Sequence, residues 1–394
     1  MQSFDFQCPT EVVFGRHAED SIAQKLRAYG ATKVFIVYGG GSVVRSGLLA
    51  HIERLLTEGG LAFEVRGGVQ PNPRVGLVRK CILEAVACGA DFVLGIGGGS
   101  VIDSAKAIAH GAANPDVDIW DFWTGAVKLE KTLPIATVLT LAAAGSETSD
   151  SAVLTNEDTG KKQGLNTQLN RPTISFLNPE LAMTAPLHQI ICGLCDIYMH
   201  TLERYFTDVK EPNLFTDRVA ESLLRTLIEV APVITADPHN YDAMSEIMWC
   251  GSVSHCNFTE LGRHKDFSVH RLGHELSGRF DVTHGESLTA LWGSWASYMY
   301  KNDVERFAHY AEAVWDVTAG TPEERAQAGI KKTVEFFRSL HMPTCFSELS
   351  IGVQPAHVID ELADMLTAGD TKKIGCFHPL DKATAIEIYN LANH

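Results

Sequence analysis

The chain has 394 residues, and its 33 Lys and Arg against 48 Asp and Glu give a formal net charge of −15. This negative charge argues against nucleic acid or an anionic membrane surface as a partner, and a composition with 45% hydrophobic and 21% charged residues excludes disordered and fibrous proteins. No segment has the roughly 18 charge-free apolar residues of a membrane span, and the N-terminus lacks the basic start and apolar core of a signal peptide. Nine cysteines, an odd number in a long chain, predict no disulfide framework and a cytoplasmic location.

The first half of the chain alternates between short β-forming segments and helical segments. Helices such as those expected at residues 47–56 and 73–87 lie between the β-forming segments. Strand, helix, strand at this spacing is typical of parallel βαβ units, whose sheet is covered on both faces. The expected strands are residues 33–38, 61–66, 91–97, 134–141 and 174–177.

From about Pro186 onward, β-forming segments nearly disappear. Thr321-Pro-Glu-Glu324 is a predicted helix start with a capping box and a first-turn proline. Apolar residues at helical spacing predict further helices at 218–234, 357–366 and 383–391. We therefore predict two domains, an α/β domain over residues 1–185 and an all-helical domain over residues 186–394.

Two Gly-Gly-Gly-Ser sequences follow predicted strands, and each opens toward a helix. The first is Gly39-Gly40-Gly41-Ser42 and the second is Gly97-Gly98-Gly99-Ser100. Backbone without side chains can approach a phosphate closely, and a helix start offers free N–H groups and the positive end of a dipole. Neither loop matches G-x-G-x-x-G, and one alone would be weak evidence because tight turns use glycine without any ligand. Two such loops at neighbouring strand ends predict one elongated ligand with phosphates, a dinucleotide.

The residue at the end of the first predicted strand bears on which dinucleotide binds. A site for NAD normally has a carboxylate here that binds the ribose 2′-hydroxyl, but this chain has Gly39. Because there is no acid at this position, a 2′-phosphate would not be repelled, and backbone N–H groups, Ser42 and Arg45 could bind it. Arg45 could equally be a solvated surface residue. On balance the sequence favours NADP.

The helical half carries Asp196-x-x-x-His200, then His270-x-x-x-His274, then His284. Residues four apart lie one helical turn apart, so Asp196 and His200 can converge on one ion. One carboxylate with two or three imidazoles suits Fe²⁺, Zn²⁺ or a similar ion with a position open for substrate. The spacing does not choose between His270 and His274. A single pair of this kind is usually only a polar helix face, but apolar neighbours predict a buried helix, where unpaired His and Asp would be costly.

Cys192 and Cys195 immediately precede this helical pair. An isolated C-x-x-C could be redox-active or half of a zinc site. There is no second C-x-x-C, and this one lies inside a helical pattern. We expect two ordinary core cysteines.

Taken in order, these motifs resemble the iron-containing (group III) alcohol dehydrogenase family, particularly its butanol dehydrogenase and NADPH-dependent aldehyde reductase branch. The resemblance covers essentially the whole chain and implies a Rossmann-like α/β domain followed by a helical domain, an architecture shared in outline with dehydroquinate synthases. It also implies a homodimer. The segments that carry it are residues 38–43, 97–106, 139–147, 196–200 and 270–276, together with His284.

The resemblance implies a role for each matching residue. It makes Asp196, His200, His270 and His284 the metal ligands, with Fe²⁺ or Zn²⁺ as the ion, and leaves His274 beside the substrate as a proton donor or relay. Gly97, Gly98, Gly99 and Ser100 would hold the pyrophosphate of NADP(H). Further cofactor contacts implied by the resemblance are Asp103, near the nicotinamide, and Thr140, Ser149 and Lys162, although residues 141–144 depart from the family's usual Thr-x-Gly-Thr form.

Three classes of function are compatible with these motifs. The first is a metal-dependent, NADPH-linked aldehyde reductase and alcohol dehydrogenase acting on a small molecule by hydride transfer. The second is a lyase or cyclase of the dehydroquinate synthase type, which would need several Arg and Lys residues near the metal to bind a phosphorylated substrate. Only Arg271 and Arg279 qualify around His270 and His284. The third is a non-catalytic metal- or nucleotide-binding protein.

Overall fold

The computed structural model describes residues 1–394, which divide into two compact units. An α/β unit contains Gln7–Pro186 and His239–Cys256, and a helical unit contains Met1–Phe6, Leu187–Pro238 and Asn257–His394. Chain order alone assigned residues 1–6 to the first domain and residues 239–256 to the second. In the structure, residues 1–6 instead belong to the helical unit and residues 239–256 to the α/β unit.

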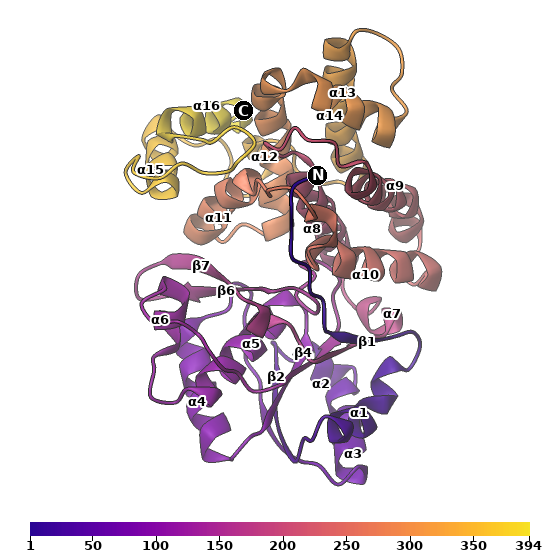
Figure 1. Cartoon of the computed structure of the whole chain (residues 1–394), viewed down its shortest axis with the longest axis vertical. Coiled ribbons are helices and arrows are strands. Elements are labelled where there is room, and N and C mark those ends of the chain that lie inside the picture. Colours follow the sequence, from indigo (N-terminus) through magenta and orange to yellow (C-terminus); the bar gives the residue numbers. More distant parts are fainter. The chain divides into compact units, whose positions relative to one another are not determined.

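A six-stranded sheet forms the centre of the α/β unit (Figure 1). Its strand order is β1-β8-β5-β4-β2-β3, and every neighbouring pair is parallel, which confirms the predicted parallel sheet. The strands are β1 (Glu11–Phe14), β2 (Lys33–Tyr38), β3 (Ala62–Arg66), β4 (Phe92–Gly97), β5 (Ile135–Leu139) and β8 (Ile174–Leu177). The sequence did not predict β1, nor an antiparallel hairpin of β6 (Ser151–Asn156) and β7 (Lys161–Asn166). The β7 sequence KKQGLN has no alternating apolar pattern to reveal it.

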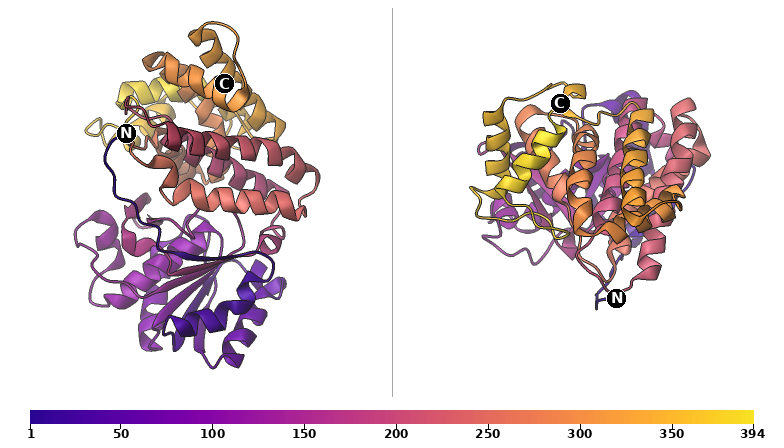
Figure 2. Two further views of the ribbon diagram at one scale, coloured as in Figure 1. Left: turned by 45° about the vertical axis from the view of Figure 1, so that its right-hand side comes forward. Right: turned by 90° about the horizontal axis from the view of Figure 1, so that it is seen from above.

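Helices cover both faces of this sheet, as Figure 2 shows. On one face Val34 and Ile36 pack with α1 (Ile22–Ala28) and α3 (Leu48–Glu58). Phe35 and Val37 point to the other face, where α4 (Val75–Ala87) and α5 (Gly99–Ala113) bury their apolar sides. The unit also contains the helices α2 (Ser42–Arg45), α6 (Ile119–Thr124), α7 (Pro179–Ala182) and α10 (Tyr241–His255).

The helical unit is built around an aromatic core. Phe206 stacks on Phe307 with ring centroids 4.2 Å apart, and Trp292 and Trp295 are almost fully buried. Thr321 and Glu324 form the predicted capping box at the start of α14. None of the helices combines the length and hydropathy needed to traverse a bilayer. The helices are α8 (Leu187–Tyr205), α9 (Leu214–Ala236), α11 (Ser268–Phe280), α12 (His284–Met299), α13 (Val304–Trp315), α14 (Pro322–Ser339), α15 (Ala356–Thr367) and α16 (Lys382–Ala392).

Candidate dinucleotide site and metal centre

The two glycine loops begin side by side at a reversal of strand order. From β2 the chain first adds β3 on one side, then crosses back to add β4 on the other side of β2. Tyr38 of β2 pairs with Ile96 of β4, so the loops starting at Gly39 and Gly97 leave the same edge of the sheet. A crevice at the carboxyl ends of strands at such a switch point is the usual nucleotide site of open α/β sheets.

Close packing explains the glycines of the second loop. A Cβ atom at Gly97 would lie 2.5 Å from Cγ2 of Val101. At Gly98 it would lie 3.2 Å from Cβ of Leu141, and at Gly99 it would lie 3.3 Å from Cβ of Ala144. Residues 141–144, which depart from the family's usual Thr-x-Gly-Thr form, therefore lie directly against this loop. The N–H of Thr140 donates to the carbonyl of Gly97, at 3.1 Å, and fixes the start of that segment.

The first loop has room for a larger residue at its start. A Cβ atom at Gly39 would meet the Val69 carbonyl oxygen at 3.5 Å, an ordinary contact, whereas Gly41 has φ 103° and favours glycine. Nη1 of Arg45 lies 3.4 Å from the position that a Cβ of Gly41 would occupy. The guanidinium group therefore folds back over the glycine loop.

Asp103 lies inside the α/β unit with both carboxylate oxygens hydrogen-bonded to protein. Oδ1 accepts from the Ser146 hydroxyl at 2.6 Å and Oδ2 from the Val153 N–H at 2.9 Å. Burial raises the pKa of Asp103, while nearby Lys106 opposes the shift. Lys106 is itself fully buried, and burial lowers its pKa to about 8. A buried lysine requires polar partners, and Nζ of Lys106 donates to the backbone carbonyls of Ser149 and Ser151.

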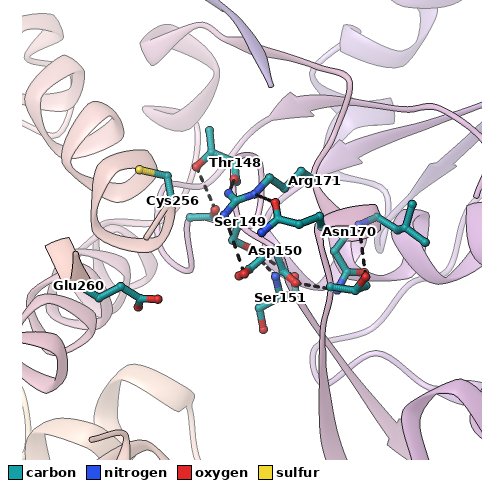
Figure 3. Close-up of polar contacts among 12 residues, drawn as sticks. Thr148, Ser149, Asp150, Ser151, Asn170, Arg171, Cys256 and Glu260 are labelled. Carbon is teal, nitrogen blue, oxygen red and sulfur yellow. Dashed lines mark hydrogen bonds and ion pairs between the residues drawn. The ribbon is translucent and has the colours of Figure 1, made fainter. Parts of the chain in front are cut away.

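Ser149 belongs to a buried cluster of polar contacts, shown in Figure 3. Its hydroxyl accepts from Nζ of Lys106 at 3.3 Å and donates to the Ser151 carbonyl at 3.2 Å. Beside it, Nη1 of Arg171 donates to the Thr148 carbonyl at 2.5 Å. Nζ of Lys162, on β7, donates to Oδ1 of Asn72 at 3.0 Å. The cofactor roles of Asp103, Thr140, Ser149 and Lys162 stay predictions.

Three helices of the helical unit bring together the residues predicted to bind a metal ion. Asp196 and His200 lie one turn apart on α8, His270 is in the first turn of α11, and His284 begins α12. Measured from Oδ1 of Asp196, Nε2 lies at 3.3 Å in His200, at 3.4 Å in His270 and at 3.7 Å in His284. One ligand atom each from Asp196, His270 and His284 lies within 4.8 Å of the others. The predicted burial of this helix is confirmed, since α8 is buried from Ile190 to Tyr205.

The spacing of these atoms fits a bound cation. Separations of 3.3 to 3.7 Å are longer than ordinary hydrogen bonds of about 2.7–3.2 Å. Ligand atoms about 2.0–2.1 Å from a tetrahedral ion lie about 3.3–3.4 Å from one another. Nε2 of His270 is buried and forms no well-directed hydrogen bond, which is costly without a ligand. The group with all ligand atoms within 4.8 Å of one another holds one carboxylate and two imidazoles and does not include His200, whose Nε2 lies 3.3 Å from the same Asp196 oxygen. These donor types suit Fe²⁺ or Zn²⁺.

The electrostatics of His270 agree with this fit. Burial by itself would lower the pKa of His270, but Glu203 and Asp196 raise it to about 9. Carboxylates at both ends of the ring favour a positive charge on it or next to it. No motif marked Glu203, because its partner His270 is 67 residues away in sequence. The sequence could have indicated Glu203 in one way only: a carboxylate in a helix predicted to be buried needs a partner.

His274 lies one turn after His270 on α11. Its ring centroid is 5.3 Å from that of His284 and 6.3 Å from that of His270. Nε2 of His270 lies 3.4 Å from Oδ1 of Asp196. The assignment of His270 as a ligand and of His274 as a proton donor stays a prediction.

Cys192 and Cys195 are buried in α8 as free thiols. Burial, reinforced by Glu286 and Asp196, raises the pKa of Cys192 to about 12, and burial raises the pKa of Cys195 well above its usual range. A thiol must ionise to act as a nucleophile or metal ligand, so this environment disfavours both roles.

We expect replacement of both cysteines by alanine to leave turnover within several-fold of wild type. The loss of two small buried side chains should cost roughly 1 kcal/mol or so of stability each. Steady-state kinetics and metal analysis of Cys192→Ala/Cys195→Ala test this. Abolished turnover with the fold and metal content intact would show that the thiols take part in the chemistry.

Comparison with known proteins identifies the family. Residues 9–179 match the model of the iron-containing alcohol dehydrogenase family, and residues 190–392 match that of the family's C-terminal region. The chain is 37% identical over 391 residues to NADH-dependent butanol dehydrogenase A of Clostridium acetobutylicum, with 99% of each chain covered. It is 33% identical over 359 residues to the NADPH-dependent aldehyde reductase YqhD of Escherichia coli, covering 89% of this chain and 90% of that protein.

A solved structure of a relative has the same fold. The crystal structure of NADH-dependent butanol dehydrogenase A from Thermotoga maritima superposes with a TM-score of 0.95 at 30% identity, covering 100% of this chain and 99% of the other. The architecture expected from the resemblance is thereby confirmed. The chain belongs to the iron-containing alcohol dehydrogenase family.

Proposed function

We propose that this protein interconverts a small aldehyde and its alcohol with NADP(H) and one divalent metal, Fe²⁺ or Zn²⁺, held by Asp196, His200, His270 and His284. The observation that carries the proposal is the convergence of three imidazole nitrogens on one carboxylate oxygen, at 3.3 to 3.7 Å. The relatives named as butanol dehydrogenases and as an aldehyde reductase support this reaction class. The family resemblance further leads us to expect a homodimer.

The proposed roles follow from the chemistry of the side chains. When bound, the metal would supply Lewis acidity toward a carbonyl oxygen and the nicotinamide would supply or accept the hydride. Asp196, His200 and His270 are each at most 4% exposed, so water is largely excluded from this part of the site and charges there are weakly screened. A ring nitrogen of His274 is proposed to deliver a proton to the alcohol oxygen in reduction and to remove it in oxidation.

The preference for NADPH is the finer part of the proposal. It is supported by Gly39, directly after β2, where an acid would repel a 2′-phosphate, and by the Arg45 guanidinium folded over the loop. The names of the relatives divide between NADH and NADPH, so the choice depends on this chain's own residues.

We expect kcat/KM to be at least about 10-fold higher with NADPH than with NADH, since a charged hydrogen bond contributes roughly 1.5–3 kcal/mol. Gly39→Asp should reverse or erase this preference, mainly by raising the KM for NADPH. A Cβ atom at this position makes only ordinary contacts. Arg45→Ala should weaken NADPH more than NADH. Equal use of both cofactors by the wild-type enzyme would contradict the proposal.

The reaction is tested by the decrease in absorbance at 340 nm when NADPH and butanal are mixed with metal-loaded enzyme. A lyase or cyclase of the dehydroquinate synthase type would leave the absorbance unchanged, because it uses its dinucleotide only transiently. Family membership does not favour that alternative. Analysis of protein purified without chelators identifies the metal, and no bound metal together with no oxidation of NADPH would refute the proposed function.

A further inference from the structure

Glu203 is a buried carboxylate of α8 that is not among the four proposed metal ligands, and its side chain is 1% exposed. Its Oε1 accepts hydrogen bonds from the backbone N–H of Val269, at 2.6 Å, and of His270, at 3.2 Å. Its Oε2 is hydrogen-bonded to Nδ1 of His270. All three partners of this carboxylate lie in the first turn of α11.

The two backbone contacts show how α8 and α11 are joined. The first N–H groups of a helix have no partner within the helix and attract negative charge. The residue before α11, Phe267, provides no side-chain cap. Glu203 supplies this cap from a distant part of the chain, so the start of α11 has a defined position relative to α8.

The contact with Nδ1 determines the state of the His270 ring. A carboxylate that is ionised can only accept hydrogen bonds, and Nδ1 is the proton-carrying atom in a contact of that kind. In the neutral ring, Nε2 then keeps its lone pair, and this atom lies 3.4 Å from Oδ1 of Asp196. With both ring orientation and tautomer held from the Nδ1 side, the lone pair faces the group formed with Asp196, His200 and His284.

We propose that Glu203 is a positioning residue for the metal centre, which holds His270 in the Nδ1–H tautomer and directs Nε2 toward the metal. The assignment rests on the proposed function, because it requires His270 to be a ligand. Carboxylates that hold a metal-bound histidine in this way typically contribute about 10–100-fold in metal affinity. A purely structural role, in which Glu203 only caps α11, would leave that affinity nearly unchanged.

Metal affinity of the full-length protein separates the two roles. Each variant is stripped of metal and titrated with Co²⁺, whose visible absorption reports coordination, in competition with a chelator of known affinity. Glu203→Gln should bind Co²⁺ about 10–100-fold more weakly than wild type. The matched control is Asp217→Asn, which removes another largely buried carboxylate of the helical unit, one paired with Arg306 and Arg263. It should leave Co²⁺ affinity within about 3-fold, a change of less than 1 kcal/mol.

A double-mutant cycle tests whether Glu203 acts through His270. In a His270→Ala background, Glu203→Gln should cause little further loss of Co²⁺ affinity. Equal Co²⁺ affinity of Glu203→Gln and wild type would overturn the assignment, as would a full further loss in the His270→Ala background. If Glu203→Gln does not fold by circular dichroism, Glu203→Asp, whose shorter side chain reaches Nδ1 less well, replaces it with the same expected direction. Failure of wild-type protein to bind Co²⁺ would overturn the proposed function, and the assignment with it.

Discussion

We expect His284→Ala to lose its bound metal and its turnover while keeping its fold. The side chain begins α12 and is 29% exposed, so its removal creates no large internal cavity. It removes one of three nitrogens that converge on Oδ1 of Asp196. Lewis-acid catalysis is worth several kcal/mol, so turnover should fall by roughly 10³-fold or more. His200→Ala should behave similarly.

Metal analysis, steady-state kinetics and circular dichroism check this result together. The matched control is His309→Ala, which removes a half-exposed histidine of the same unit whose ion-pair partner is Glu221. It should retain metal and turnover. Metal content and turnover that survive His284→Ala would show that this histidine is not a ligand. Because metal release can be slow, chelation experiments require incubation long enough to reach equilibrium.

His274→Ala should give the opposite combination, with normal metal content and slow turnover. The proposal places His274 beside the substrate, and its ring centroid lies 5.3 Å from that of His284. If it is the general acid and base, kcat should fall by about 10²-fold or more. The binding of NADPH should change little, since the expected loss is in proton transfer.

A comparison with His270→Ala makes this prediction sharp. The two residues are one turn apart on the same helix, so a general disturbance of α11 would affect both variants alike. Metal loss in His274→Ala comparable with that in His270→Ala would make His274 a ligand. Normal turnover of His274→Ala would instead assign proton delivery to another group. The pH dependence of kcat distinguishes a lost acid and base from a packing defect, because only the former removes an ionisation from the profile.

Local chemistry explains which elements the sequence could predict. The strands β2 and β4 are rich in β-branched and aromatic residues and lead directly into glycine loops, and their predicted bounds lie within one residue of the observed ones. The capping box at Thr321 is encoded within four residues and forms as expected. By contrast β7, which is polar and lies at the surface, acquires its conformation by pairing with β6.

By itself, the sequence determined the parallel α/β fold, the helical second half, the two glycine loops and the set of possible metal ligands. Each of these is indicated by residues within a few positions of one another. Only the tertiary structure decided which of these residues meet. The strand order that places the loops beginning at Gly39 and Gly97 side by side requires the crossover from β3 to β4. The approach of His270 to Asp196 depends on how α8 lies against α11, and the contact of Glu203 with His270 joins residues 67 positions apart in sequence. Such contacts between distant segments are selected by burial and charge pairing in the folded chain, and no local pattern records them.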